Sequence, residues 1–180
     1  LLGALTCVLA TGAFAADTIA SGTCGEHTAW TLDSDGVLTV TGTGEMNCFM
    51  MSPHAQWEEE RDKIRSVVIE DGVTSIGKSA FPDCKNLTSV TIPDSVTVIG
   101  RYAIEHCGAL GDVTLPDSVT SIGEHAFEGC VSMKNIKLSE SLTEVGNHAF
   151  QNCTGLTHVA LPKGVTRIPA RLFDGCTALR

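Results

Sequence analysis

The feature that most constrains the fold is a 23-residue repeat. When the sequence is shifted by this length, apolar residues coincide in column after column over residues 64–180. A fixed period of about 20 to 50 residues is typical of a solenoid, in which each unit covers an apolar face of its neighbour. We therefore expect residues 64–180 to form a solenoid of about five stacked units, which continues beyond residue 180.

Each unit predicts the same order of short elements. In residues 87–109, the alternation of apolar and polar residues around Val90 is typical of a short strand. Pro93 ends this strand because proline lacks the N–H that a ladder requires. A second extended piece covers 96–100, and the apolar spacing in 101–107 suits one or two helical turns. The predicted fold class is an α/β-type repeat solenoid with short parallel strands and short helical turns.

The repeated motif resembles a known family. The stretch "LTSVTIPDSVTVIGRYAIEHC", residues 87–107, is similar to the BspA-like class of bacterial leucine-rich repeats, whose units follow the pattern LxxVxIPxSVTxIGxxAFxxC. The resemblance covers residues 64–180, and residues 21–46 resemble the segment that precedes such repeats in secreted bacterial proteins. It implies a curved solenoid displayed outside the cell, often linked to adhesion or host contact, and no enzyme activity. The departures are Glu70, Ser139, Ile104, and Pro169 with Leu172 in the last unit.

Residues 1–16 predict a secretory signal peptide. The stretch is apolar, has no charged residue and contains Ala13-Phe14-Ala15, which fits an A-x-A cleavage pattern. A transmembrane anchor is the alternative, but the run is shorter than the ~20 residues that a span needs. Because an initiator methionine and a basic leading region are missing, we expect the chain to be truncated at this end. The predicted location is secreted or on the bacterial cell surface.

Residues 17–63 predict a small N-terminal cap. Alternating apolar residues flank the sequence "DSDG" at 33–36, which is typical of a β-hairpin, and Ser52-Pro53 suits the start of a short helix. Solenoids need an atypical terminal unit that shields the first apolar face. A separate functional domain is the alternative. Cys24 and Cys48 are the only cysteines of this segment, and the sequence leaves open whether they form a disulfide.

The cysteines of the repeats form a separate column. Disulfides between neighbouring coils are conceivable, because paired parallel strands lie about 4.8 Å apart. The odd number and the inward position of these residues favour a ladder of buried free thiols. The ladder consists of Cys84, Cys107, Cys130, Cys153 and Cys176.

The histidines of the repeats offer a weak metal hypothesis. His125 and His148 share a column, so their imidazoles should lie close together on adjacent coils. With Glu124 or Asn147 as a third ligand, they would begin a zinc site. We favour ordinary surface histidines, and we predict no metal, no cofactor and no catalytic residues, because no nucleophile and base recur together.

The predicted ligand-binding surface is the strand face of the solenoid. Residues between core positions point outward from a sheet, and here they vary from coil to coil while the core columns stay nearly constant. Free drift of surface positions is the alternative explanation. The candidate positions are Ser89, Thr91, Asp112, Thr114, Asn135, Lys137 and His158.

Two functions remain after this reasoning. We favour a noncatalytic extracellular module that binds a protein or a glycan. The alternative is an accessory or spacer region of a larger secreted enzyme. The formal net charge of -9 disfavours nucleic acid and direct binding to a membrane surface, because both need a concentrated positive field.

Overall fold

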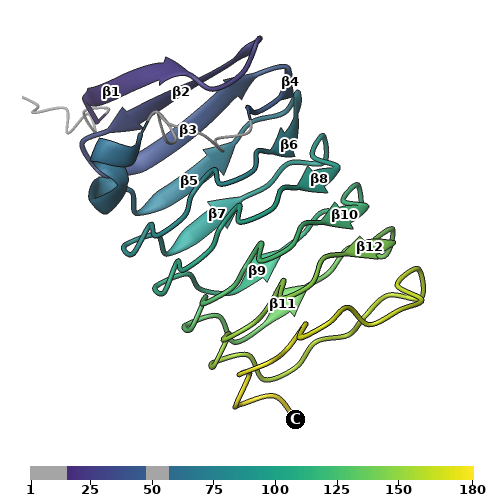
Figure 1. The fold of residues 1–180 in the computed structure, drawn as a ribbon. Coiled ribbons are helices and arrows are strands. Elements are labelled where there is room, and N and C mark those ends of the chain that lie inside the picture. Colours follow the sequence, from purple (N-terminus) through teal and green to yellow (C-terminus); the bar gives the residue numbers. More distant parts are fainter. Residues whose placement is uncertain (1–15, 48–56) are drawn as a thin grey trace, which may run out of the picture.

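The computed structural model describes residues 16–47 and 57–180, which form a stack of coils (Figure 1). Three expectations fall outside the described residues. They are the signal peptide, of which residues 1–15 are outside, the pairing of Cys48, and the helix start at Ser52-Pro53. The described elements are β1 (Thr18–Thr23), β2 (Thr28–Asp33), β3 (Val37–Gly42), β4 (Gly44–Glu45), the 3-10 helix η1 (Glu58–Lys63), β5 (Ser66–Ile69), β6 (Val73–Ile76), β7 (Ser89–Thr91), β8 (Val98–Ile99), β9 (Val113–Thr114), β10 (Ser121–Ile122), β11 (Ile136–Lys137) and β12 (Glu144–Val145).

The stack begins with antiparallel strands and continues with parallel ones. β1, β2 and β3 pair antiparallel, and the turn between β2 and β3 is held by the Asp33 carboxylate, which accepts hydrogen bonds from the N–H groups of Asp35 (3.0 Å) and Val37 (2.9 Å). Gly36 has a φ of 84° in this turn, a conformation that glycine adopts without strain. β3 then pairs parallel with β5, so the first sheet has the order β1-β2-β3-β5-β7.

The parallel strands keep one register along the stack. Ser66 pairs with Ser89 and Ser121 pairs with Glu144, so partners in neighbouring coils occupy the same position of the sequence repeat. A second five-stranded sheet has the order β12-β10-β8-β6-β4, and β9 pairs with β11 in a two-stranded sheet. The fold is therefore a solenoid in which each coil as far as β12 adds one strand to each side.

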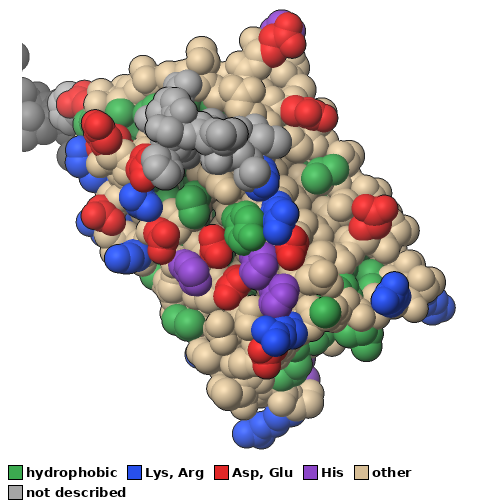
Figure 2. Space-filling view, viewed as in Figure 1, with side chains coloured by type: hydrophobic (Ala, Val, Ile, Leu, Met, Phe, Trp, Pro, Cys, Tyr) green, Lys and Arg blue, Asp and Glu red, His purple; other side chains and the backbone are tan. Residues whose placement is uncertain are grey.

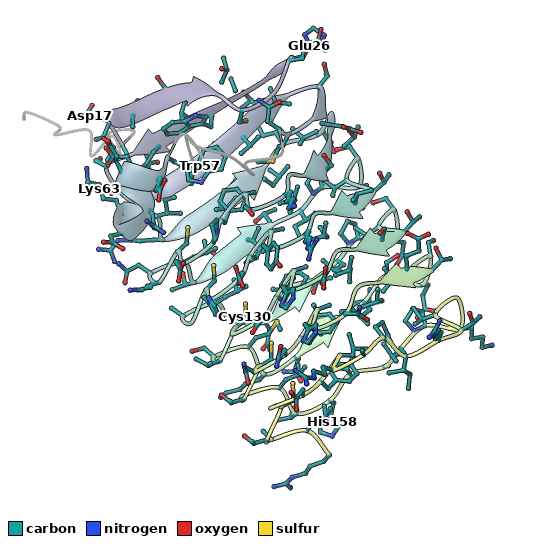
Figure 3. All side chains as sticks on the ribbon, in the orientation of Figure 1. Asp17, Glu26, Trp57, Lys63, Cys130 and His158 are labelled. Atoms are coloured by element: carbon teal, nitrogen blue, oxygen red, sulfur yellow. The ribbon has the colours of Figure 1, made fainter. Side chains whose placement is uncertain are left out.

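The interior is built from the repeated apolar columns. Phe81, Phe127 and Phe150 are fully buried, and the rings of Phe127 and Phe150 stack with centroids 5.6 Å apart. At the N-terminal end Trp57 stacks on Phe81 at 5.1 Å, meets Trp30 edge-on at 5.5 Å, and donates a hydrogen bond from Nε1 to the Ala80 carbonyl (Figure 3). We name the rings of Trp57, Phe81, Phe127, Phe150 and Phe173 the aromatic column. It begins in the N-terminal segment and extends into the repeats.

The expected helical turns are wrong. Residues 101–107 and their equivalents form tight turns, and η1 is the only helix within residues 16–47 and 57–180. Tyr102, His125 and His148 have φ values of 56°, 57° and 60°, which interrupt the right-handed helical conformation. The N–H groups of Tyr102 and Ile104 instead donate to Glu124 and Ala126 of the next coil, at 3.0 and 2.8 Å. These corners therefore contribute hydrogen bonds between coils.

The last coil departs from the others. The second sheet stops at β12, and Ile168, which is equivalent by the repeat to the buried Ile122, is 69% exposed. In earlier coils a glycine follows the equivalent residue, and its N–H donates to the preceding coil, as Gly123 does to Ile99 at 2.8 Å. Pro169 takes this position and has no N–H. A Cβ at Gly123 would also lie 2.5 Å from the backbone N of Arg101, so a larger residue cannot approach as closely.

Candidate functional site

The strand-face candidates lie together on one side of the stack. They come from β7, β9 and β11 and from the residues beside these strands, and all seven are exposed. The alternating residues Val113 and Ile136 are 3% and 6% exposed, so the pleat directs the candidates outward. His158, labelled in Figure 3, continues this face through an isolated parallel bridge to Asn135.

Asp112 already has partners within the solenoid. Its carboxylate accepts hydrogen bonds from the backbone N–H groups of Lys134 (3.0 Å) and Asn135 (2.9 Å) and from Asn135 Nδ2 (2.8 Å). The hydrogen bonds from Asn135 lower the pKa of Asp112, because they stabilise its charged form. Asp112 and Asn135 therefore join two coils, and Ser89, Thr91, Thr114, Lys137 and His158 remain the candidates to contact a ligand.

The cysteine column lies in the corners of the coils. Cys84, Cys107, Cys130 and Cys153 are buried free thiols, whereas Cys176 is partly exposed and free. Each thiol from Cys107 onward donates to a backbone carbonyl 26 residues earlier, for example Cys130 to Ile104 at 3.2 Å. Burial raises the pKa of Cys130 to about 12. The interior of the solenoid therefore holds the Cys130 thiol in its neutral form at neutral pH.

Cys24 is also a buried free thiol. Its sulfur donates a hydrogen bond to Thr28 Oγ1 at 3.5 Å, and burial raises its pKa. Cys48 lies outside the described residues, so the structure does not test the question of a disulfide between the two, which the sequence left open.

The expected proximity of His125 and His148 is confirmed. Their rings stack with centroids 4.5 Å apart and an interplanar angle of 5°, and Tyr102 stacks on the other side of His125 at 4.9 Å. Figure 2 shows histidine side chains gathered among acidic and basic ones on this side of the molecule. We name the three stacked rings of Tyr102, His125 and His148 the ring column.

Sequence reasoning missed the polar partners of the ring column. His125 Nδ1 contacts the Glu128 carboxylate, and His148 Nδ1 lies 2.7 Å from Gln151 Oε1. Glu105, from the preceding coil, approaches the same imidazole of His125. The signal in the sequence is a ring residue followed three positions later by a polar residue, which recurs at the period of the solenoid.

A groove of about 760 Å³ opens between β12 and the last coil. Its lining includes Glu144 and Val145 of β12 and Arg167, Ile168 and Pro169 of the last coil. Within the described residues no backbone hydrogen bond joins 166–169 to β12. The groove is where Pro169 prevents the close approach made by the glycines of earlier coils.

Comparison with known families identifies the repeat. The BspA type leucine rich repeat region matches residues 59–180 in six copies. The chain belongs to this family. The resemblance noted in the sequence is thus confirmed, and the BspA-type repeats begin five residues earlier and include one more copy than the sequence pattern predicted. A search of curated proteins found no match.

Three solved bacterial structures illustrate the likeness of these BspA-type repeats. A leucine-rich repeat protein from Bacteroides ovatus is 29% identical with a TM-score of 0.68, over 93% of this chain and 46% of that one. One from Eubacterium ventriosum is 28% identical with a TM-score of 0.63, over 81% and 45%. A leucine rich cell surface protein from Faecalibacterium prausnitzii is 25% identical with a TM-score of 0.56, over 91% and 54%.

The relation to these proteins is partial in length. The chain spans about half of each of the three bacterial proteins that it matches. The helical structure within residues 16–47 and 57–180 includes no segment with the length and hydropathy of a membrane span.

Proposed function

We propose that the chain is a noncatalytic binding module of a secreted or cell-surface bacterial protein, which recognises an extracellular protein or glycan through its strand face. The observation that carries the proposal is that seven chemically varied side chains are exposed on one face. The repeated apolar residues behind this face fix its register. The cell-surface description of the Faecalibacterium prausnitzii protein supports the proposed location.

The proposed organisation has three parts. Residues 1–16 are a secretory signal, residues 17–63 a cap, and residues 64–180 the solenoid of 23-residue units. The antiparallel strands β1 to β3 support the cap, because they extend the first sheet beyond the parallel strands. Trp57 supports it further, because its ring covers Phe81 at the start of the aromatic column.

The chemistry of the strand face favours many weak contacts. Its candidate side chains are polar, and the only charged ones are Asp112 and Lys137. Such a surface lacks the large aromatic anchors that dominate tight interfaces. Strands in neighbouring coils are about 4.8 Å apart, so a ligand with repeated groups would meet several coils at once and gain affinity by multivalency.

The test is binding of the purified protein to an array of matrix proteins and glycans. A variant combining Thr114→Ala, Lys137→Ala and His158→Ala should abolish binding to any ligand found on the wild type. The matched control combines Asp94→Ala, Asp117→Ala and Glu140→Ala, which are exposed, occupy equivalent positions of successive coils and lie in turns away from the strand face.

The control variant should bind as the wild type does. Equal binding by the two variants would contradict the strand-face assignment. The variants leave Asp112 unchanged, because its hydrogen bonds join two coils.

A further inference from the structure

Three potential metal ligands meet where two coils turn. Glu105 belongs to one corner, and His125 and Glu128 belong to the next. One ligand atom from each of the three side chains lies within 4.8 Å of the other two. The backbone N–H of His106 donates to the carbonyl of Glu128 at 2.6 Å, so the two corners are fixed against each other directly beside this cluster.

The ring column orients the imidazole of His125. Tyr102 and His148 stack on its two faces with interplanar angles of 17° and 5°. The ring therefore has little freedom to rotate, and its nitrogens point along the coil, with Nδ1 toward Glu128. The side chains of His125 and Glu128 are only 18% and 14% exposed. Such preorganisation lowers the entropy lost when a ligand binds.

The cluster has more negative than positive charge. The guanidinium of Arg101 is paired with Glu124 at 2.5 Å, and Glu124 lies 3.7 Å from His125 Nε2. A cation placed between Glu105 and Glu128 would offset the cost of keeping two carboxylates partly out of water.

We propose that Glu105, His125 and Glu128 form a binding site for a divalent transition-metal ion of the zinc class. An imidazole with two carboxylates suits Zn²⁺ and its first-row neighbours, whereas Mg²⁺ and Ca²⁺ prefer oxygen ligands alone. Zn²⁺ takes such ligands at about 2.0 to 2.2 Å, which rotation about the side-chain bonds of the two glutamates can provide. Water completes the coordination, and the ion takes the place of the proton between His125 and Glu128.

The neighbouring coil provides a natural comparison. His148 has the same positive φ and a similar stacked ring, but Gln151 stands where His125 has Glu128. His148 and Gln151 contact each other through a hydrogen bond, but this pair contains no carboxylate that could bind a cation. The structure therefore assigns one such site to the residues that it describes.

The test is titration of the purified, chelator-stripped protein with Zn²⁺ by calorimetry, and with Co²⁺ by visible absorption. We expect one strong equivalent, with Co²⁺ bands typical of nitrogen and oxygen ligands. His125→Asn removes the imidazole and keeps a residue that tolerates positive φ. This variant and Glu128→Gln should each weaken binding at least tenfold, because both remove a direct ligand.

His148→Asn is the matched control, because it also removes a stacked ring at a positive φ. It should retain the stoichiometry and most of the affinity. Equal weakening by His148→Asn and His125→Asn would overturn the proposal, as would unchanged binding in Glu128→Gln or Ca²⁺ binding as tight as Zn²⁺ binding. Glu128→Gln copies the polar pair of the next coil, so it keeps the test valid if His125→Asn lowers the melting temperature.

Discussion

The coils that contain β8, β10 and β12 differ from the last coil at the residue that follows the second strand. Gly100, Gly123 and Gly146 each donate a hydrogen bond of 2.8 to 2.9 Å to the preceding coil, and β8, β10 and β12 pair in register. At Pro169 the pairing stops and a groove opens. Ile168 keeps the apolar character of its column and is nonetheless exposed. Close backbone approach, and not the apolar column alone, therefore decides whether a coil joins the sheet.

The largest expected effect is on the aromatic column. Phe127→Ala should destabilise the protein by about 3 to 5 kcal/mol, because it leaves a cavity in a fully buried part of the stack. Phe173→Ala removes the equivalent ring of the last coil, which is only partly buried, and should cost clearly less. Urea denaturation followed by circular dichroism measures both. Equal losses would show that the last coil is packed as firmly as the others.

The next effect concerns the glycine column. Gly123→Ala should destabilise by about 1 to 3 kcal/mol, because its Cβ would lie 2.5 Å from the backbone N of Arg101. Pro169→Ala in the same column should be almost neutral, because the last coil is already separated from β12. A thermal melt of the two variants separates these outcomes. A Gly123→Ala protein as stable as the wild type would refute the role given to close approach.

A smaller effect, of about 1 kcal/mol, is expected from Pro169→Gly. The substitution restores an N–H and removes the ring, so 166–169 should pair with β12. One added hydrogen bond and the burial of Ile168 favour the folded state, whereas the flexible glycine also favours the unfolded one. Hydrogen exchange should show slower exchange at residues 166–169. Unchanged exchange in the variant would mean that another feature separates the last coil.

The smallest effect on folding is expected from modification of Cys176. The neighbouring Cys153 thiol lowers the pKa of the partly exposed Cys176, because it can donate a hydrogen bond to the Cys176 thiolate, whereas burial raises the pKa of Cys130 from 9.0 to about 12. At neutral pH an alkylating reagent should therefore modify Cys176 first and Cys130 only after unfolding. Peptide mapping by mass spectrometry measures the order. Early modification of Cys130 would show that the central coils open as readily as the last.

The same pKa of Cys130 gives a dependence of stability on pH. The unfolded thiol loses its proton near 9.0, whereas the folded thiol keeps it until about 12. The contribution of Cys130 is thus fully present below pH 9.0 and is lost as the pH rises toward 12. Cys130→Ala should reduce this loss, as measured by denaturation between pH 8 and pH 10.

Much of the fold could be predicted from the sequence, because each core position is repeated. The buried Leu87, Leu110 and Met133 all lie in one predicted column. The turns at Tyr102 and His125 could not be predicted in the same way, because neither residue type marks a positive φ as glycine does. The effect of Pro169 depends on a contact between coils, which the spacing within one coil does not contain.

The candidate sites show the same division. The exposure of Lys137 and His158 follows from the alternation of residues along a strand. The partners of Asp112 and the meeting of Glu105 with His125 depend on neighbouring coils. To predict these contacts, one must know both the register between coils and the directions of the side chains. The period of the repeat gives the register but not the side-chain directions.

The position of Trp57 has a practical consequence for spectroscopy. The chain has two tryptophans, Trp30 and Trp57, and their indoles touch at the N-terminal end of the stack. Intrinsic fluorescence is therefore an optical reporter of that end alone, and it is blind to fraying of the coils near Arg180. Urea denaturation can be followed both by tryptophan emission and by far-ultraviolet circular dichroism. A higher midpoint by emission would show that the solenoid unfolds from the end near Arg180 toward the N-terminal end.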